Sequence, residues 1–486
     1  MQKYTLNIRI LTWLILLFCL SAKSQVLQWS NPTKLKGAAV YSKVLGENEY
    51  GVFLLRYRNR FYSKNVIIEQ YNHHLALEQS KTFDLKNARL IKLYLLENSI
   101  LFVKSSYYKA NQSNQLIAQH YSFDFKAQGE PILLAEADVR EYGNRGNFRL
   151  RISDDHSFYS LVFSNPAENG DMVIHHKLFD SNLNEIHLKS IQLPIDYEDF
   201  IIQDFLVTNQ GDVAFLTNSI YKQRRRISNM VQSMYYLRGD ELSDYVVTDS
   251  LEIKAIDLVY DRVNDKPRLV GFFGTKDEYG IVGSLFFEID DSLNCGLLNT
   301  SLFAEELIDE ISVNDRNNGT VSEGFQILKT IPRNDGGTLC IAEQKEIATE
   351  DDIVMVNGIP QSTSKNVYNF NEIVVLNYDS SGFLDWSKVI TKNQTTINDG
   401  GYFSSAVVYV GDKYIQLLYN DQLRNTGDIM QYTIYNNGKM ESNKLLKTEL
   451  DYVAIIPAES KQVSSNKVVI STSKNRRFAL LKLIYD

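Results

Sequence analysis

The sequence has little of what marks disordered, fibrous or membrane-spanning chains. Only 8 prolines and 25 glycines occur among 486 residues, which excludes collagen-like and Pro/Gly-rich disordered proteins. No apolar run reaches the roughly 18 residues that a membrane-spanning helix needs, so we expect no transmembrane segment. Hydrophobic residues make up 44% of the chain, enough for a large core in one repeat-built domain or in several ordinary domains.

The motifs that identify many enzymes and cofactor-binding proteins are also absent. The sequence contains no CxxC, HExxH, GxSxG, GxGxxG, P-loop or DxDxDG motif. His175 and His176 are adjacent in a strand-like run, so their rings point to opposite faces and cannot chelate one metal as a pair. We therefore expect no cofactor and no metal site, and a hydrolase that uses a nucleophile elbow is disfavoured.

Residues 1–24 have the features of a secretory signal peptide. Lys3 and Arg9 precede an apolar run at residues 10–20, and small residues occupy the −3 and −1 positions before Gln25. Phe18 stands where a lipobox needs a small residue before Cys19, which disfavours a lipoprotein. The sequence therefore predicts an exported protein that is periplasmic, outer-membrane-associated or extracellular.

The charge and the cysteines of the mature chain limit its partners and its redox chemistry. Removal of three basic residues with the signal peptide changes the formal net charge from −8 to −11. A duplex nucleic-acid binder needs a basic footprint, so no nucleic-acid partner is expected. The two remaining cysteines, Cys295 and Cys340, lie in apolar strand-like segments, and we expect buried hydrophobic side chains rather than a disulfide.

One pattern recurs along the chain: an apolar, aromatic-rich strand ends at an Asp or Asn turn, and a second strand follows. The turn residues are at positions 72, 124, 180, 240, 290, 379, 436 and 486, so most intervals are 50 to 60 residues and one is 89. About four strands fit into each interval, which is typical of a β-propeller. The pattern predicts an all-β, eight-bladed β-propeller over residues 25–486, with seven blades as the alternative.

The two ends of the mature chain predict how the ring closes. The last repeat stops at Asp486 without an outer strand, whereas residues 26–30 at the N-terminus resemble the outer strand at residues 383–387. Trp29 and Trp386 occupy the same place in these two segments. We expect the N-terminal strand to complete the C-terminal blade, because closure removes an edge that would otherwise promote aggregation.

The 89-residue interval contains two insertions, at residues 301–320 and 346–370. Residues 301–312 are predicted to be helical because Phe303, Leu307 and Ile311 recur every four residues. Residues 346–370 read as a polar loop that contains a short apolar run at 353–356. We expect the two insertions to form a lid or a docking edge, with the apolar run as its anchor.

Two segments give the chain a resemblance to a known group of proteins. Residues 331–337 (IPRNDGG) precede a strand, and residues 398–405 (NDGGYFSS) follow Trp386. In these segments the chain resembles a family of exported, propeller-like bacterial proteins of unknown function, most closely from residue 325 to 421. The resemblance implies fold and export only, because it carries no catalytic motif.

Blade geometry predicts which end of the propeller binds a ligand. If the strands of a blade are named a to d from the axis outward, the b–c loops and the d-to-a crossings share one end, and these connections are the long ones here. Binding residues usually lie on loops that a rigid scaffold holds in place. The predicted binding residues are Tyr62, Tyr107, Tyr108, Arg145, Arg225 and Tyr402.

Two functions remain open at this point. The first is a non-catalytic, monomeric binding or scaffold module of the cell envelope, whose partner is an envelope protein or a glycan. The second is a carbohydrate-active or other hydrolytic enzyme that uses carboxyl groups at the channel mouth. The only acidic residues that we nominate for that role are Asp196, Glu198, Asp199 and Asp399.

Overall fold

The structure of the chain is a computed structural model that describes most of the predicted propeller. The described residues are 25–34, 41–58, 65–85, 88–138, 147–223, 226–248, 250–275, 280–289, 296–311, 316–317, 320–321, 324–356, 359–423, 427–446, 453–474 and 477–485. The predicted signal peptide, with Cys19, lies outside the described residues, as do Cys295 and the candidate residues Tyr62, Arg145 and Arg225.

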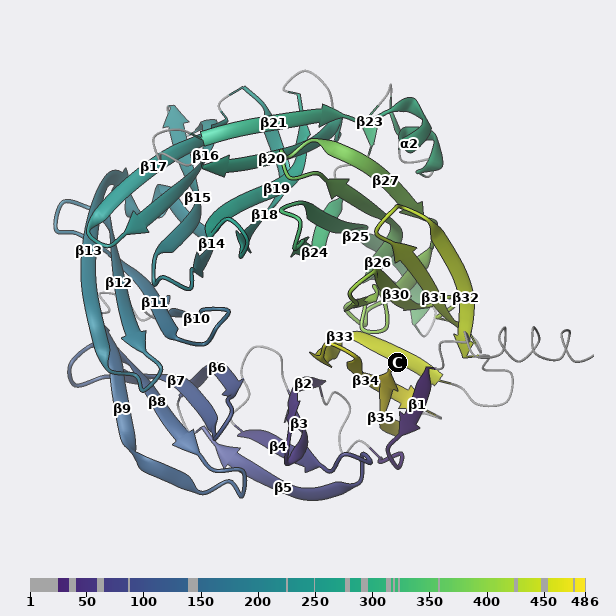
Figure 1. Cartoon of the computed structure of the whole chain (residues 1–486), viewed down its shortest axis with the longest axis horizontal. Coiled ribbons are helices and arrows are strands. Elements are labelled where there is room, and N and C mark those ends of the chain that lie inside the picture. The colour runs from purple at the N-terminus through teal and green to yellow at the C-terminus, as the bar shows by residue number, and fades with distance from the viewer. Residues whose placement is uncertain are drawn as a thin grey trace, which may run out of the picture.

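The described residues form eight antiparallel blades around a central axis, which confirms the eight-bladed propeller (Figure 1). Blades 1 to 4 each contain four strands in sequence order from the axis outward. Blade 1 is β2 (Tyr41–Asn48), β3 (Gly51–Tyr57), β4 (Asn65–Tyr71) and β5 (Leu77–Asp84), and blade 2 is β6 (Arg89–Leu95), β7 (Ile100–Tyr108), β8 (Ser113–Tyr121) and β9 (Ala127–Asp138). Blade 3 is β10 (Arg149–Ile152), β11 (Phe158–Pro166), β12 (Asp171–Asp180) and β13 (Glu185–Asp196), and blade 4 is β14 (Phe200–Val207), β15 (Val213–Gln223), β16 (Arg226–Arg238) and β17 (Glu241–Thr248).

Blades 5 to 8 follow the same order, with additions in blade 6. Blade 5 is β18 (Glu252–Asp261), β19 (Lys266–Gly274), β20 (Gly283–Ile289) and β21 (Gly296–Leu302), and blade 6 is β24 (Phe325–Pro332), β25 (Thr338–Val356), β26 (Ile359–Tyr378) and β27 (Leu384–Ile390), with β28 (Gln394–Ile397) paired to β26. Blade 7 is β29 (Val407–Val410), β30 (Tyr414–Asn420), β31 (Ile429–Tyr435) and β32 (Met440–Leu446), and blade 8 is β33 (Val453–Ser464), β34 (Lys467–Lys474), β35 (Arg477–Ile484) and the N-terminal β1 (Val26–Trp29).

The N-terminal strand closes the ring as predicted. β1 runs antiparallel to β35, with Leu27 opposite Leu483 and Trp29 opposite Leu481. The backbone of Ser30 continues the ladder by donating to the carbonyl of Leu480 at 2.9 Å. Blade 8 therefore takes one strand from the start of the chain and three from its end, and the ladder between β1 and β35 joins the two ends.

The hydrophobic core is a ring of clusters, one between each pair of neighbouring blades. Alternate residues of one strand serve two clusters, because successive side chains in a strand point to opposite faces. In β3, Val52 and Leu54 pack against blade 8, whereas Phe53 and Leu55 pack against blade 2. Strands that are buried on both faces need nearly continuous apolar runs, and this explains the repeated pattern in the sequence.

The turns between the third and fourth strands are built alike in several blades. In blades 1, 3 and 6 the side-chain oxygen of Asn72, Asp180 or Asp379 accepts hydrogen bonds from the backbone two and four residues later, at 2.8 to 3.0 Å. This side-chain capping explains why Asp and Asn mark the repeat. We call the end of the propeller that carries these turns and the a–b turns the turn face, and the opposite end the loop face.

The two insertions of the 89-residue interval differ from their predicted forms. The helix exists as α2 (Glu305–Glu310) but is shorter than residues 301–312, and Leu307 and Ile311 pack with Phe303 into the cluster between blades 5 and 6. The prediction of a polar loop at 346–370 is wrong, because β25 and β26 continue as a paired hairpin from Lys345↔Phe370 to Val356↔Ile359. Pairing between the two strands satisfies the backbone N–H and C=O groups of this segment, which a loop would expose to water.

Two short elements complete the fold. The 3-10 helix η1 (Tyr197–Asp199) links blades 3 and 4, and β22 (Arg316–Asn317) pairs with β23 (Thr320–Val321) between blades 5 and 6. Within the described part of the chain, no helix is long and apolar enough to cross a membrane.

Candidate functional site

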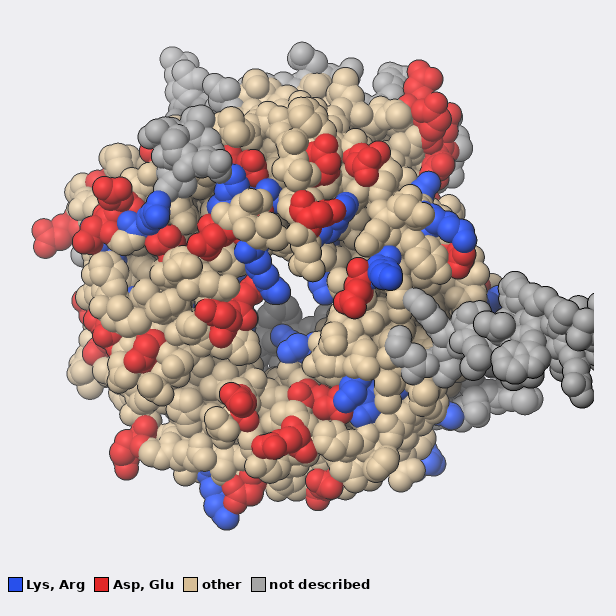
Figure 2. Space-filling model, viewed as in Figure 1, with Lys and Arg blue, Asp and Glu red and all other residues tan. Residues whose placement is uncertain are grey.

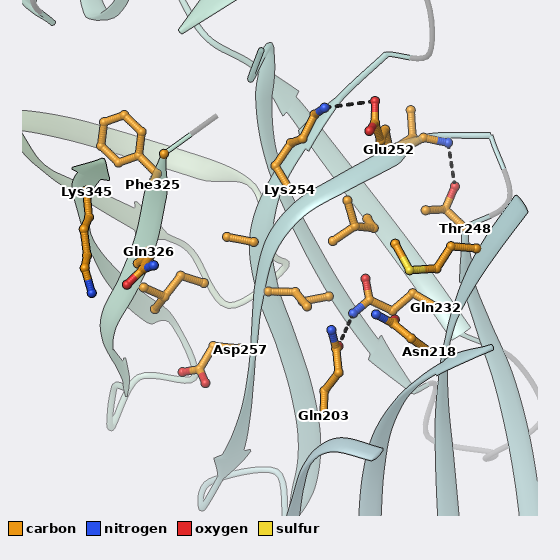
Figure 3. A pocket seen from close by; sticks show the side chains of 17 residues that line it. Gln203, Asn218, Gln232, Thr248, Glu252, Lys254, Asp257, Phe325, Gln326 and Lys345 are labelled. Carbon is orange, nitrogen blue, oxygen red and sulfur yellow. Dashed lines mark hydrogen bonds and ion pairs between the residues drawn. The ribbon is translucent and has the colours of Figure 1, made fainter. Parts of the chain in front are cut away.

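A pocket of about 750 Å³ opens between blades 4, 5 and 6 (Figure 3). It is lined by the first halves of β18 and β24, by the ends of β15 and β16 that lie toward their connecting loop, and by Lys345 at the base of the blade 6 hairpin. These segments all lie at the loop face, because inner strands begin there and b–c loops connect there. The pocket therefore occupies the end of the propeller that the connection lengths favour for binding.

Backbone bulges shape this pocket. The register shifts between Ile202 and Asp204 in β14, between Ile253 and Ala255 in β18, and between Glu343 and Lys345 where β25 pairs with β26. A bulge adds a residue to one strand and redirects side chains out of the regular alternation. Three residues at or beside these shifts, Gln203, Lys254 and Lys345, line the pocket.

Side-chain amides supply much of the polar lining. Gln232 donates a hydrogen bond to Gln203, and the two side chains meet on one wall (Figure 3). The side-chain oxygen of Asn218 is buried and has no hydrogen-bond partner among the described residues. Amides offer donors and acceptors at neighbouring positions, so this wall suits a ligand that carries several hydroxyl groups.

Charged groups occur at both sides of the same pocket. Lys254 forms an ion pair with Glu252 at 2.9 Å, and the Lys345 ammonium lies 5.1 Å from the centre of the Phe370 ring. Burial raises the pKa of the Asp257 carboxyl, and the nearby Asp204 carboxylate raises it further. The pocket therefore holds two carboxyl groups in different settings, one paired with an ammonium group and one partly desolvated.

A close backbone approach forms the floor near blade 6. Gly324 accepts a hydrogen bond from the Lys345 backbone at 2.7 Å, and a Cβ atom at residue 324 would lie 2.8 Å from the Lys345 carbonyl oxygen. Only glycine permits this approach without a shift of the backbone. Phe325, the next residue, lines the pocket and is buried against Phe272 of blade 5, so the pocket wall is continuous with the core between blades 5 and 6.

The acidic residues nominated from the sequence lie elsewhere. Asp196 ends β13 and accepts a hydrogen bond from the Glu198 backbone at 2.9 Å, so its carboxylate caps the 3-10 helix that contains Glu198 and Asp199. Asp399 accepts a hydrogen bond from the Gly401 backbone at 2.8 Å in the crossing from blade 6 to blade 7. The structure thus brings three of the four together in one turn and leaves Asp399 at a crossing three blades away.

The described aromatic candidates form two separate groups. Tyr107 and Tyr108 end β7 in blade 2, where Tyr108 is exposed. Tyr402 packs edge-on against Tyr41 of blade 1, with ring centres 5.8 Å apart, and against Phe403 at 4.9 Å. None of the nominated residues that the structure describes lines the pocket.

Sequence reasoning missed the pocket because its residues are scattered from position 203 to position 345. Each lies in a strand that reads as part of the repeat, and a bulge leaves no local mark in the alternation of apolar and polar residues. One available signal was the presence of a polar residue in the first half of three successive inner strands, at Gln203, Lys254 and Gln326. Among the residues that the structure describes, no three His, Cys, Asp or Glu side chains are placed to hold a metal ion.

Comparison with known proteins supports no specific relationship. No protein-family model matches the chain, and no curated protein is similar to it. Among solved structures, it is similar to the polysaccharide lyase Uly1, with 10% identity, 94% of this chain and 99% of that chain covered, and a TM-score of 0.40. It is also similar to the β-propeller domain of the Trilobed protease from Pyrococcus furiosus (11% identity, 87% and 96% covered, TM-score 0.35).

A third structure, a protein of unknown function from Dyadobacter fermentans, gives 7% identity, coverage of 96% and 98%, and a TM-score of 0.32. These identities describe a general likeness of architecture, and no residue role follows from them.

Proposed function

We propose that this protein is an exported, non-catalytic β-propeller that binds a polyhydroxylated ligand, such as a glycan of the cell envelope, through its loop face. The observation that carries the proposal is the pocket between blades 4, 5 and 6, with its wall of amides, two lysines and apolar side chains such as Ile253, Ile256 and Ile327. Sugar recognition needs paired donors and acceptors beside apolar surface, and this lining offers both.

Three further features support a binding role over a purely structural one. The pocket lies on inner strands of a closed ring, so its walls are held by the clusters between blades 4, 5 and 6. The Asn218 oxygen is a buried acceptor that lacks a partner among the described residues, and a ligand hydroxyl would satisfy it. Export, which residues 1–24 predict, would place the pocket where envelope glycans occur.

The test is direct binding of soluble glycan fragments to the purified mature protein, measured by calorimetry. Gln232→Ala removes one amide of the wall and should weaken binding by about tenfold, since a hydrogen bond to a buried polar group contributes about 1–1.5 kcal/mol. Gln128→Ala is the matched control, because Gln128 is an exposed amide on the outer strand of blade 2. Equal affinities of both variants and the wild type for a ligand that binds would contradict this site.

A second candidate function is hydrolysis or lyase chemistry in the same pocket, and one observation favours it. The raised pKa of Asp257 is the property that a general acid needs, and Glu252 lies in the same lining. If the protein is an enzyme, Asp257→Asn should abolish turnover of a bound glycan while leaving its affinity within a few fold. Absence of turnover in the wild type, with binding intact, favours the binding module.

A further inference from the structure

Basic side chains border the axial opening of the propeller, although the chain as a whole is acidic (Figure 2). Five basic residues lie on the inner strands of four adjacent blades: Lys461 on β33, Lys43 on β2, Lys92 on β6, and Arg149 and Arg151 on β10. We call these five residues the channel cluster. It lies on blades 8, 1, 2 and 3, the half of the ring that does not form the pocket.

The members of the channel cluster are close enough to repel one another. Burial, and then the charges of Lys43 and Arg151, lower the pKa of Lys92. Burial and the charge of Lys43 also lower the pKa of Lys461. Like charges that converge in a partly desolvated channel destabilise the free protein, and a bound anion would relieve that repulsion.

Only part of this positive charge is compensated within the described residues. Arg151 forms an ion pair with Asp204 of blade 4, and Asp257 of blade 5 is the next carboxyl group that acts on Arg151. Asp204 and Asp257 therefore offset only part of the charge of the five cations. In the part of the chain that the structure describes, no hydrogen-bond or ion-pair partner is found for the ammonium groups of Lys43 and Lys92.

Bulges in the inner strands lie next to these side chains and set their direction, as in the pocket. The register shifts between Val44 and Gly46 in β2, between Leu90 and Lys92 in β6, and between Ile456 and Lys461 in β33. Lys461 donates a hydrogen bond of 2.6 Å to the carbonyl of Leu45, the bulged residue of the neighbouring blade. Arg149 donates to the Gln203 carbonyl at 3.0 Å, so both side chains are held in position by the backbone of other blades.

We propose that the channel cluster is a binding site for a small anion that carries two or more negative charges, such as a phosphate ester or a polycarboxylate. The two guanidinium groups present planar forks that match the oxygens of either group, and the two unpaired ammonium groups add charge beside them. A monovalent anion would neutralise too little of the cluster to compete with salt. The channel cluster adjoins the glycan pocket at blade 4, where Arg149 contacts the Gln203 carbonyl, but Lys43, Lys92 and Lys461 come from blades that do not line the pocket.

Calorimetric titration of the mature protein with inorganic pyrophosphate, and separately with citrate, tests the proposal. We expect at least one of the two to bind, with an affinity that falls as the salt concentration rises. Tighter binding of pyrophosphate identifies phosphoryl groups as the ligand chemistry, and tighter binding of citrate identifies carboxylates. Failure of both to bind the wild-type protein at low salt overturns the proposal.

Two double variants with the same change in net charge locate the site. Lys43→Gln with Lys92→Gln should weaken binding by at least tenfold. Lys126→Gln with Lys439→Gln, on exposed turn-face lysines, should leave it within twofold. Equal loss of anion affinity in both double variants would show a general effect of net charge and would contradict a specific site at the channel cluster.

The fold of the variants and the independence of the pocket are checked together. The Lys43/Lys92 variant should unfold at the same temperature as the wild type or higher, because two mutually repelling charges are removed. Should that double variant fail to fold, Lys92→Gln alone carries the test: a loss of threefold or more is expected, and wild-type affinity would overturn the proposal. Gln232→Ala in the glycan pocket should leave anion binding unchanged, and a loss there would place the anion in the pocket.

Discussion

The turn face and the loop face of this propeller differ in how far each follows the repeat. On the turn face, blades 1, 3 and 6 use the same capping by Asn72, Asp180 and Asp379. On the loop face, blade 6 extends a long hairpin, a short helix follows blade 5, and a pocket opens across three blades. One end of the ring thus preserves the fold, and the other end carries the variation from which a binding site can be made.

Charge is also distributed differently at the two ends. On the turn face, Arg268 of blade 5 is buried, with 1% of its side chain exposed, and pairs with the fully buried Asp261 at 2.9 Å and with Glu288 at 3.0 Å. It also donates to the Gly336 carbonyl of blade 6 at 2.6 Å, which links the two blades. At the loop face, Lys254 and Glu252 pair at the wall of a pocket, and a second buried pair, Lys392 with Glu343, lies at the base of the blade 6 hairpin.

The largest expected effect comes from breaking the buried charge network of the turn face. Arg268→Ala leaves the Asp261 carboxylate buried without its counter-charge, and removing one partner of such a pair typically destabilises by about 3–5 kcal/mol. Chemical denaturation should show this loss. Lys254→Ala at the loop face is the comparison, and we expect a change below about 1 kcal/mol because its partner Glu252 is exposed. Similar losses in both variants would erase the difference between the faces.

The next effect tests the geometry of a turn on the same face. Gly382 ends the blade 6 turn with a φ of +80°, and a Cβ atom there would lie 2.3 Å from the Phe286 ring of blade 5. Gly382→Ala should therefore destabilise by about 2–4 kcal/mol through backbone strain and overpacking. Gly170→Ala, at a b–c turn on the loop face, is the control. Its φ is also positive, at +92°, but no atom lies within 4 Å of the added Cβ, so strain alone should act.

The closure of the ring by β1 contributes to stability independently of both faces. Trp29 of β1 is half-buried against the cluster between blades 7 and 8, and the Lys474 ammonium lies 5.0 Å from its ring centre. Trp29→Ala should lower the free energy of unfolding by about 1.5–3 kcal/mol. Removal of residues 25–31 should lower it further, because the whole β1–β35 ladder is lost. An unchanged melting temperature after this deletion would refute closure by β1.

The smallest effect is expected from shortening the blade 6 hairpin. Its base is held by the buried Lys392–Glu343 pair at 2.7 Å and by the bond from Lys392 to the Phe370 carbonyl at 2.9 Å. Farther out, Ile353 is 72% exposed. Replacing residues 350–365 by Asn-Gly joins the paired Thr349 and Asn366 through a two-residue turn, and stability should change by less than about 1 kcal/mol.

The same shortened protein tests the predicted docking edge. If residues 350–365 contact an envelope partner, the variant should lose capture of that partner while it keeps its fold. A stability loss of several kcal/mol would instead identify the hairpin as a structural strut. The contrast between a turn face that follows the repeat and a loop face that departs from it would then weaken.

Several parts of the fold could be predicted because they leave local marks in the sequence. Asp180 and Asp379 cap their turns with a side-chain oxygen, which requires Asp or Asn. Strands such as β3 are buried on both faces, which requires continuous apolar runs. The repeat could therefore be recognised in the sequence. The hairpin at 346–370 could not be recognised in the sequence, because its stability comes from cross-strand pairing between residues such as Thr349 and Asn366 rather than from apolar alternation. Its many acidic and hydroxyl-bearing residues therefore gave the segment the composition of a loop.

The sequence by itself determined the repeat and the strand that closes the ring, because each depends on residue types at fixed spacing along one segment. It left eight or seven blades, and the structure decided for eight. Only the tertiary structure decided where Gln203, Lys254 and Lys345 meet, and which cations of the channel cluster lie together. These groups come from different blades, and the bulges that turn them toward one another change the register between strands without changing the composition of either strand. Spacing along the chain cannot reveal a site whose residues are neighbours only across a closed ring.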